Sequence, residues 1–243
     1  MRHDLNIVVP VYNEAENFPR FYESIRSSVR TSNQILVVYD HDEDTTLPVA
    51  REIAARDPGV TLVKNQFRGV LGALKTGLAH PGGRAVLVTM VDGSDDHTQI
   101  DQMFGLFEQG HAVVVASRYA RGGRQEGGPL VKGLLSRGAG MFLRVVGGLP
   151  TWDPTNSFKL YSRKLVDSVQ IESSGGFEIG LELTVKAHQR GLRIIDIPTV
   201  WKDRVAGKSN FKLMKWLPHY LRWFFDALAF RFGLKRAQRL QPE

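Results

Sequence analysis

The chain of 243 residues contains no cysteine. Disulfide bonds, thiol catalysis and cysteine-based zinc sites are therefore excluded. A chain without cysteine also fits a reducing compartment, where disulfides are rare. With 42% hydrophobic and 23% charged residues, the composition predicts one folded domain with a sizeable core, and it excludes a disordered or fibrous chain.

The sequence also lacks any run of about 20 uncharged apolar residues, the length that a transmembrane helix requires. We therefore expect no membrane-spanning helix. The first apolar run turns polar at Asn13 and is too short for a secretory signal peptide. From these two features we expect a cytoplasmic location.

An excess of either charge is missing from most of the chain. Residues 1–201 hold 22 basic and 22 acidic residues, whereas residues 202–243 hold ten and three, so the net charge of +7 lies in the tail. A basic tail of this kind indicates an anionic binding surface, of which a membrane and a nucleic acid are the two candidates.

What the first half does contain is a regular alternation of apolar strands and amphipathic helices. Strands without polar alternation are typical of a largely parallel sheet covered by helices on both faces. Strands are predicted at 5–11, 35–39, 60–63, 85–91 and 112–116, and helices at 14–29, 46–56, 70–79 and 100–108. Ligands in such sheets bind beyond the carboxyl ends of the strands.

The second half is less regular. Residues 119–129 are rich in glycine and arginine and are predicted to form a mobile loop. Helices are predicted at 130–146 and 177–190, and strands at 157–161 and 193–197, before an aromatic-rich helical tail.

Two acidic clusters follow the second and fourth predicted strands. They are Asp40, Asp42 and Asp44, and Asp92, Asp95 and Asp96. Because both follow strands of one parallel sheet, we expect them to converge on a single site. Their oxygen ligands favour Mg²⁺ or Mn²⁺, which would bridge a diphosphate. The alternative for any single aspartate is a cap on the following helix.

Basic side chains surround the glycine-rich loop and recur near the tail. They are Arg118, Arg121, Arg124, Lys132 and Arg137, followed by Arg204 and Lys208. Such side chains bind phosphates, and guanidinium groups do so in bidentate fashion. The alternative is a solvated basic face.

The segment 218–234 has the pattern of an amphipathic helix. A helical wheel places His219, Arg222 and Asp226 in one narrow stripe, and large apolar side chains, Trp223 and Phe225 among them, over the rest. This pattern is typical of a helix that lies in a membrane interface, and the charged positions argue against spanning. The alternative is a helix docked on the domain or on a partner.

Eight short motifs follow one another in a distinctive order. They are Val9–Glu14, Tyr39–Asp44, Arg68–Leu78, Asp92–His97, Ala116–Gly123, Leu134–Ala139, Asp153–Lys159 and Asp203–Ser209. Together they resemble glycosyltransferase family 2, and within it the polyprenyl-phosphate sugar synthases typified by dolichyl-phosphate mannose synthase. The resemblance covers nearly the whole chain up to about Asn210.

The resemblance implies a GT-A-like fold: an α/β domain with a doubly wound mixed sheet, helices on both faces and a C-terminal amphipathic helix. The expected division is a transferase domain at 1–210 and a basic amphipathic membrane-surface segment at 211–243. The implied activity is inverting transfer of a sugar from a nucleoside diphosphate, of the GDP-mannose or UDP-glucose type, to polyprenyl or dolichyl phosphate. The protein would then lie on the cytoplasmic face of a membrane.

The resemblance also assigns residues to roles. The residues that would bind the nucleotide sugar are Pro10, Tyr12, Glu14, Asp40, Asp92 and Gly93, and those that would bind Mg²⁺ or Mn²⁺ are Asp92, Ser94 and Asp95. The residues that would bind the acceptor phosphate are Arg118, Lys132, Ser136, Arg204 and Lys208. The catalytic residues would be Asp92, Arg118 and Asp153, of which Asp153 would orient the reacting groups. Tyr39 and Ser94 stand where the family has aspartates, so either Asp95 or Asp96 supplies the missing ligand or the metal is held more weakly.

Three alternatives remain at this point. A family member with a hydroxyl acceptor would need a base such as Asp153, although the Gln-x-x-Arg-Trp signature of the processive synthases is absent. A non-catalytic nucleotide-sugar-binding protein would explain Ser94 and Tyr39. Nucleic-acid binding by the tail leaves the acidic clusters unexplained, so we expect no nucleic-acid partner. A membrane-anchoring partner, a homo-oligomer and the identity of the sugar all remain open.

Overall fold

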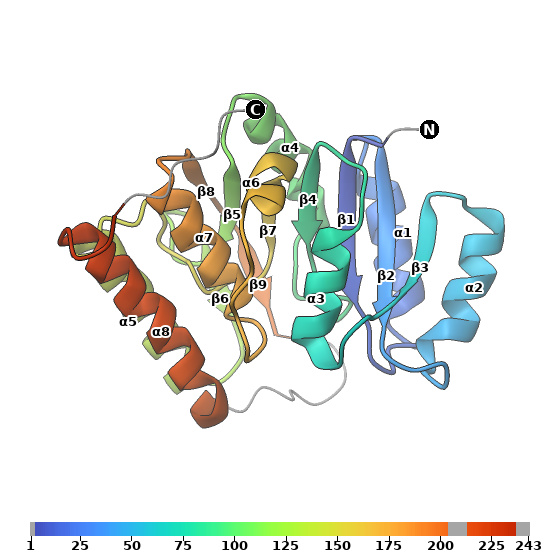
Figure 1. The fold of residues 1–243 in the computed structure, drawn as a ribbon. Helices are drawn as coiled ribbons and strands as arrows, with labels where there is room; N and C mark the ends of the chain where they lie inside the picture. Colours follow the sequence, from blue (N-terminus) through green and yellow to red (C-terminus); the bar gives the residue numbers. More distant parts are fainter. Residues whose placement is uncertain (1–2, 204–212, 237–243) are drawn as a thin grey trace.

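A mixed sheet of seven strands runs through the computed structural model of the protein (Figure 1), which describes residues 3–203 and 213–236 without the side chains of Lys132 and residues 213–215. The strands follow the order β3-β2-β1-β4-β7-β5-β8. They are β1 (Leu5–Pro10), β2 (Asn33–Tyr39), β3 (Val60–Lys64), β4 (Ala85–Val88), β5 (Val113–Ser117), β7 (Lys159–Ser162) and β8 (Ile194–Pro198).

The direction of β7 makes the sheet mixed. This strand runs antiparallel to β4 and β5, whereas the remaining neighbours are parallel. The predicted mixed sheet is therefore confirmed, and the strands differ from the predicted ranges mainly at their ends. β4 stops at Val88 rather than at residue 91, because the backbone N–H of Met90 donates to the Asp95 carboxylate instead of continuing the ladder.

Helices cover both faces of the sheet, as predicted. One face packs against α1 (Phe18–Ser28), α2 (Thr46–Arg56) and α4 (Ile100–Glu108), and the other against α3 (Gly69–Ala79), α6 (Arg163–Ser168) and α7 (Ile179–Gln189). Along β1 the side chains of Ile7 and Val9 enter the first core and that of Val8 enters the second. This alternation follows from the two-residue period of a strand.

The prediction of a mobile loop at 119–129 is wrong in part. Residues Arg124–Glu126 form β6, which pairs in parallel with β9 (Val200–Lys202) as a small second sheet. β6 is three polar residues long, and its partner lies far away in the sequence, so no local pattern marks it. The short helix η1 (His97–Gln99) and α6 are also absent from the predicted elements.

Two long helices, α5 (Leu130–Val145) and α8 (Leu213–Arg231), contact each other at one end of the molecule (Figure 1). Trp223 and Ala227 of α8 are buried against Leu143 of α5 and Leu181 of α7. The prediction that Trp223 meets lipid is therefore wrong, because its side chain is only 2% exposed and packs on the domain.

Among the helices of the described ranges, none is long and apolar enough to cross a membrane. The expected boundary between residues 210 and 211 falls outside those ranges.

Candidate active site

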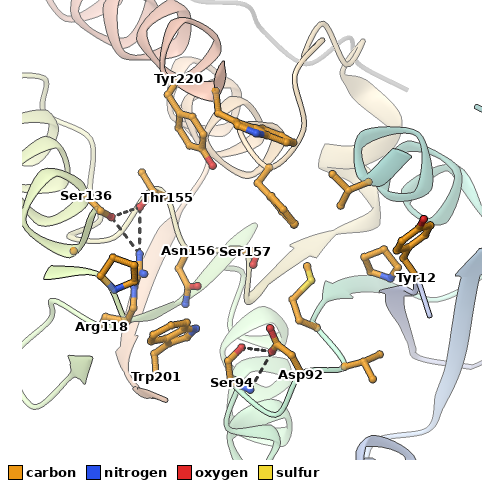
Figure 2. A pocket seen from close by; sticks show the side chains of 18 of the residues that line it. Tyr12, Asp92, Ser94, Arg118, Ser136, Thr155, Asn156, Ser157, Trp201 and Tyr220 are labelled. Atoms are coloured by element: carbon orange, nitrogen blue, oxygen red, sulfur yellow. Dashed lines mark hydrogen bonds between the residues drawn. The ribbon is translucent and has the colours of Figure 1, made fainter. Parts of the chain in front are cut away.

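A cavity of about 1520 Å³ opens at the carboxyl ends of β1, β2 and β4 and continues between α5 and α8. Ligands of α/β sheets bind at this edge, and a typical small-molecule site holds at most roughly 1,000 Å³. Pro10, Tyr12 and Asp40 line one end, which we call the β1–β2 end, and Arg118 lies at the other, the Arg118 end (Figure 2). The cavity is therefore large enough for two substrates side by side.

The β1–β2 end contains most of the predicted nucleotide-binding residues, namely Pro10, Tyr12, Glu14 and Asp40. The Asp40 carboxylate accepts hydrogen bonds from the backbone N–H of Gly69, at 2.8 Å, and from the side-chain amide of Asn65. Gly69 is the first residue of α3, so the carboxylate faces the positive end of a helix dipole. This arrangement holds Asp40 at the cavity.

The other aspartates of the first cluster have partners elsewhere. Asp44 is buried, and its Oδ1 accepts hydrogen bonds from the backbone N–H groups of Asn13 and Thr46, at 3.1 and 2.8 Å. Asp42 pairs with Lys64 on the surface. The prediction that the two clusters converge on a single site is therefore wrong for Asp42 and Asp44, because their carboxylates are bonded elsewhere. Of the first cluster, only Asp40 lines the cavity that Asp92 also lines.

Asp92 and Ser94 follow β4 and line the middle of the cavity (Figure 2). Asp92 Oδ1 accepts hydrogen bonds from the Ser94 hydroxyl, at 2.6 Å, and from the Ser94 backbone N–H, at 3.2 Å. Gly93 between them has a φ of 75°, which permits this tight turn. Gly93 was predicted to bind the nucleotide sugar, but it is not among the residues that line the cavity.

Asp95 is turned toward the backbone rather than toward the cavity. Its Oδ2 accepts hydrogen bonds from the Thr89 hydroxyl, at 2.8 Å, and from the Met90 N–H, at 3.1 Å. Burial, together with the nearby charge of Asp92, raises the pKa of the Asp95 carboxyl to about 7. Asp96 caps η1 by accepting from Thr98. The assignment of Asp95 as a metal ligand stays a prediction, and Asp96 behaves as the helix cap named as the alternative.

The oxygen atoms of this turn fit a divalent cation that arrives with a substrate. Within the described residues, no group of three or more His, Asp or Glu side chains could hold a metal by itself. Mg²⁺, however, is usually bound by one or two carboxylates together with substrate phosphates and water. The Asp92 carboxylate and the Ser94 hydroxyl offer hard oxygen donors of this kind at the cavity wall. A cation there would also offset the repulsion between Asp92 and Asp95.

The side chain of His97 supports the turn after β4 through two hydrogen bonds. Its Nδ1 lies 2.9 Å from the Ser24 hydroxyl on α1, and its Nε2 lies 3.2 Å from the Thr89 hydroxyl. The ring is buried between Phe21 and Phe158, and this burial lowers the pKa of His97 to about 4. The side chain is therefore neutral near pH 7, and it connects α1 to the turn through hydrogen bonds.

The Arg118 end is organised by a buried ion pair. Arg118 Nε donates to Asp153 Oδ2 at 2.7 Å and Nη2 donates to Oδ1 at 2.8 Å, while the Arg118 backbone N–H also donates to Oδ2. Burial alone would raise the pKa of the Asp153 carboxyl, but the charge and hydrogen bonds of Arg118 hold it below its usual range. Asp153 is fully buried, so it does not reach a ligand directly.

Two hydroxyl groups extend the donor set beside Arg118. Ser136 Oγ and Thr155 Oγ1 lie 2.6 Å apart, and each lies 3.3 Å from Arg118 Nη2 (Figure 2). Ser136 lies on α5. This helix packs closely against Trp152 because Gly140 has no side chain: a Cβ there would lie 2.3 Å from the carbonyl oxygen of Trp152. In the part of the chain that the structure describes, Arg118 Nη1 bonds no protein atom and is available to a ligand.

The side chains of the other three predicted phosphate ligands, Lys132, Arg204 and Lys208, are not among those that the structure describes. The backbone of Lys132 lies in the first turn of α5, and its side chain is not described. Arg204 and Lys208 lie outside the described residues. β9, which leads toward them, is bonded to the turn after β4 through the Lys202 N–H and the Ser94 carbonyl.

Several residues that line the cavity were not predicted. They are Thr155, Asn156 and Ser157 from the loop before β7, Trp201 from β9, and Trp216, Tyr220 and Phe224 from α8. The first three lie inside the Asp153–Lys159 motif, which could have indicated them. The position of the aromatic residues depends on how β9 and α8 dock, which no local pattern reveals.

The Arg118 end opens into a groove with apolar walls. Leu134 and Leu135 of α5 and Leu217 and Leu221 of α8 all line the cavity. The exposed apolar surface extends along both helices, because α5 exposes seven large apolar side chains, with Phe142 at 44% among them, and α8 exposes Phe225 together with Leu217 and Leu221. Exposure is 88% for Leu130, 69% for Val131, 73% for Leu134, 52% for Leu135, 54% for Met141, 71% for Val145 and 61% for Phe225, with Phe232 at 64% just beyond α8. Apolar surface of this extent marks an interaction site.

Comparison with known proteins places this arrangement in context. The profile of the family described as Glycosyl transferase family 2 matches residues 6–170. A dolichol-phosphate mannosyltransferase of Pyrococcus furiosus is 26% identical and aligns over 90% of this chain, which spans 63% of that relative's length. A polyprenol monophosphomannose synthase of Mycolicibacterium smegmatis is 27% identical, with 86% of this chain and 85% of the relative covered. An undecaprenyl-phosphate mannosyltransferase of Micrococcus luteus is 29% identical over 84% and 85% of the two chains.

Solved structures show the same fold. Glucosyl-3-phosphoglycerate synthase from Mycobacterium tuberculosis, in complex with Mn²⁺, uridine diphosphate and phosphoglyceric acid, superimposes with a TM-score of 0.66 at 20% identity. The match covers 95% of this chain and 79% of that structure. A second complex of the same enzyme, with Mn²⁺ and uridine-diphosphate-glucose, gives a TM-score of 0.66 at 22% identity.

Proposed function

Since the chain belongs to glycosyltransferase family 2, we propose that it is an inverting glycosyltransferase that moves a sugar from a nucleoside diphosphate to a polyprenyl or dolichyl phosphate. One observation supports a lipid phosphate as the acceptor: the buried guanidinium of Arg118, with the hydroxyl groups of Ser136 and Thr155, lies at the base of an apolar groove. The curated relatives are named for mannose transfer to such lipid phosphates, which favours mannose as the sugar.

The chemistry of the groove fits a phosphate that carries a hydrocarbon chain. Arg118 Nη1 can donate to a phosphate oxygen while Asp153 holds the rest of the guanidinium in place. The apolar walls from α5 and α8 would cover the first isoprene units, whose transfer from water is favourable in proportion to the area covered. A sugar acceptor would instead require polar walls to satisfy its hydroxyl groups.

The donor would occupy the β1–β2 end. The base and ribose would contact Pro10, Tyr12, Glu14 and Asp40, with the diphosphate near Asp92. We propose that Asp92 and Ser94, with Asp95 as a further candidate, hold a Mg²⁺ or Mn²⁺ ion. When bound, this cation would stabilise the negative charge of the leaving diphosphate. The donor is then of the GDP-mannose or UDP-glucose type.

Transfer would proceed by direct displacement at the anomeric carbon. An oxygen of the lipid phosphate forms the new bond on the face opposite the leaving diphosphate, which inverts the configuration. The phosphate is already anionic, so the step requires no general base. Arg118 holds this oxygen in position and offsets repulsion from the diphosphate, so that orientation and electrostatics supply most of the rate.

The state of Asp153 argues against a hydroxyl acceptor. A hydroxyl nucleophile would need a general base, and Asp153 is the residue that the sequence predicts for this role. Both of its oxygens accept hydrogen bonds from Arg118, the side chain is buried, and its pKa is held low. A carboxylate in this state is a poor proton acceptor and lies out of reach of a substrate. Its role is to position Arg118.

We propose that the exposed apolar faces of α5 and α8 meet the cytoplasmic surface of a membrane. The groove opens between these two helices, so a lipid phosphate could enter while its chain stays in the acyl region. The sequence predicts this contact for residues 211–243 alone, and the exposed side chains of α5 favour extending it to that helix. A membrane-anchoring partner or a second copy would cover the same surface, and flotation on protein-free liposomes separates these cases from direct lipid contact.

A transfer assay tests the function. Purified protein is incubated with labelled GDP-mannose or UDP-glucose, and with farnesyl phosphate, farnesol or a free sugar, in Mn²⁺ or EDTA. We expect labelled product only with farnesyl phosphate and Mn²⁺. Transfer to the free sugar alone would support the hydroxyl-acceptor alternative. Donor binding by calorimetry without transfer to any acceptor would support the non-catalytic alternative.

A further inference from the structure

The orientation of α8 on the domain is fixed by contacts along its inner face. Trp216 stacks on Phe177 at 5.8 Å between ring centroids, and it lies against Gly176 so closely that a Cβ there would overlap its ring. Two and three turns further along, Trp223 and Ala227 are buried in the core shared with α5 and α7. These contacts repeat at helical spacing, so they determine which side of α8 faces the cavity.

Polar contacts fix the same orientation from the flanks. Gln189 of α7 donates to Asp226 at 2.6 Å, and Arg222 pairs with Glu172. Helix rotation by one residue, about 100°, would break both contacts and expose Trp223. Contacts from the inner face and from the flanks therefore fix the same orientation of α8 on the domain.

Tyr220 brings a hydroxyl group into this otherwise apolar inner face. It lines the Arg118 end of the cavity, one turn after Trp216, and its hydroxyl points into the cavity above Thr155 (Figure 2). Burial raises the pKa of Tyr220, and the charge of Glu178 adds to the rise. Arg118 lowers and Asp153 raises the same pKa, so the hydroxyl lies within electrostatic reach of the buried pair.

We propose that the Tyr220 hydroxyl donates a hydrogen bond to the acceptor phosphate, so that α8 completes the phosphate site that Arg118, Ser136 and Thr155 begin. This inference rests on the proposed function and assigns a further binding residue to it. Tyr220 lies beyond residue 170, where the match to the family profile ends.

The chemistry of the site favours a neutral donor at this position. A phosphate dianion offers several acceptor lone pairs, and the Arg118 guanidinium satisfies only those on one side because Asp153 occupies its other edge. A phenol that keeps its proton donates to the phosphate from the opposite wall without adding negative charge. Hydrogen bonds to charged groups are stronger than neutral ones.

Ligand binding measured by tryptophan fluorescence tests the proposal without requiring turnover. Trp201 and Trp216 line the cavity and report its occupation. The probes are farnesyl phosphate and farnesol, which share a chain and differ in the phosphate. The variants are Tyr220→Phe and, as a matched control, Tyr22→Phe, which removes a hydroxyl of α1 that donates to Asp57 at the end of α2.

We expect Tyr220→Phe to bind farnesyl phosphate about tenfold or more weakly than the wild type, with farnesol binding unchanged, and Tyr22→Phe to match the wild type for both probes. Equal weakening of both probes would show that Tyr220 only packs the groove wall and would overturn the proposal. Unchanged binding of farnesyl phosphate would overturn it as well. If the wild type binds farnesyl phosphate with this discrimination but never forms product, the proposed transfer fails while the Tyr220 contact stands.

Discussion

Replacing Asp153 by asparagine removes one charge from the buried pair and keeps the shape of the side chain. Asp153 accepts hydrogen bonds from the backbone and side chain of Arg118 and from the Asn156 N–H. In the variant, one side of the new amide donates rather than accepts, so it opposes the Arg118 N–H groups. The guanidinium is left in a buried site without its counter-charge.

The expected loss of stability is large. Breaking a buried ion pair by removing one partner costs about 3–5 kcal/mol. For a domain of this size each kcal/mol lowers Tm by roughly 2–4 °C, so we expect a decrease of about 6–20 °C. We expect farnesyl phosphate binding to fall as well, because Arg118 loses the contact that fixes its orientation.

Urea denaturation followed by circular dichroism measures the free energy of unfolding. The control is Asp42→Asn, which removes the exposed pair with Lys64 and should leave the midpoint nearly unchanged. A second comparison uses the double variant Arg118→Met, Asp153→Leu, in which no buried charge is left unpaired. This double variant should recover part of the stability and none of the phosphate binding.

Wild-type stability in Asp153→Asn would refute this reasoning, since it would mean that the pair is not electrostatically coupled in the folded protein. A stable variant that binds both substrates but has lost turnover would point instead to Asp153 as a general base, and would revive the hydroxyl-acceptor alternative.

Three further predictions concern the turn after β4 and the surface around the groove. Asp92→Asn should lower transfer by about 100-fold or more and abolish the Mn²⁺-dependent gain in donor affinity measured by calorimetry, whereas unchanged turnover would remove the metal assignment. His97 has a folded pKa of about 4 against 6.5 unfolded, so the unfolded state binds the extra proton and stability is lost as pH falls below 6.5. Relative to wild type, His97→Gln should therefore gain roughly 2 kcal/mol between pH 7 and pH 5 in urea titrations, and a pH-independent difference would contradict the neutral buried ring. Leu134→Glu and Phe225→Glu should each reduce flotation with anionic liposomes at least about tenfold. The control Ala55→Glu, at an exposed position on α2 at the far end of the molecule (Figure 1), should float like the wild type. Equal flotation of all three variants would refute the proposal that α5 and α8 contact the membrane.

Local sequence determined a large part of the fold. The ranges of α2 and α4 agree with their predicted ends, because helical spacing of apolar residues and adjacent turn residues mark a helix within a short window. The apolar strands β1, β2, β3, β4 and β5 were also predicted, with ends that differ by one to three residues, and the resemblance anticipated the mixed sheet. Strand order and the antiparallel insertion of β7 could not be derived locally, because pairing partners lie far apart in the chain.

The candidate site divides in a similar way. Sequence motifs identified Asp40, Asp92, Arg118 and Ser136, and all four line one cavity. Which aspartates line the cavity depended on tertiary contacts. Asp44 and Asp92 belong to similar acidic runs, yet Asp44 is buried as a cap for the Asn13 and Thr46 amides. A carboxylate's hydrogen-bond partners are set by segments that meet only in the fold.

The tail gives the clearest separation between the two sources of information. Composition determined that residues after 201 are basic and rich in aromatic side chains, and it predicted an apolar or anionic partner for them. Only the tertiary structure decided that Trp223 packs on the domain, that Tyr220 enters the cavity and that α5 shares the exposed apolar surface. Periodicity shows that a helix has an apolar face, but the packing of neighbouring helices determines which part of that face is buried.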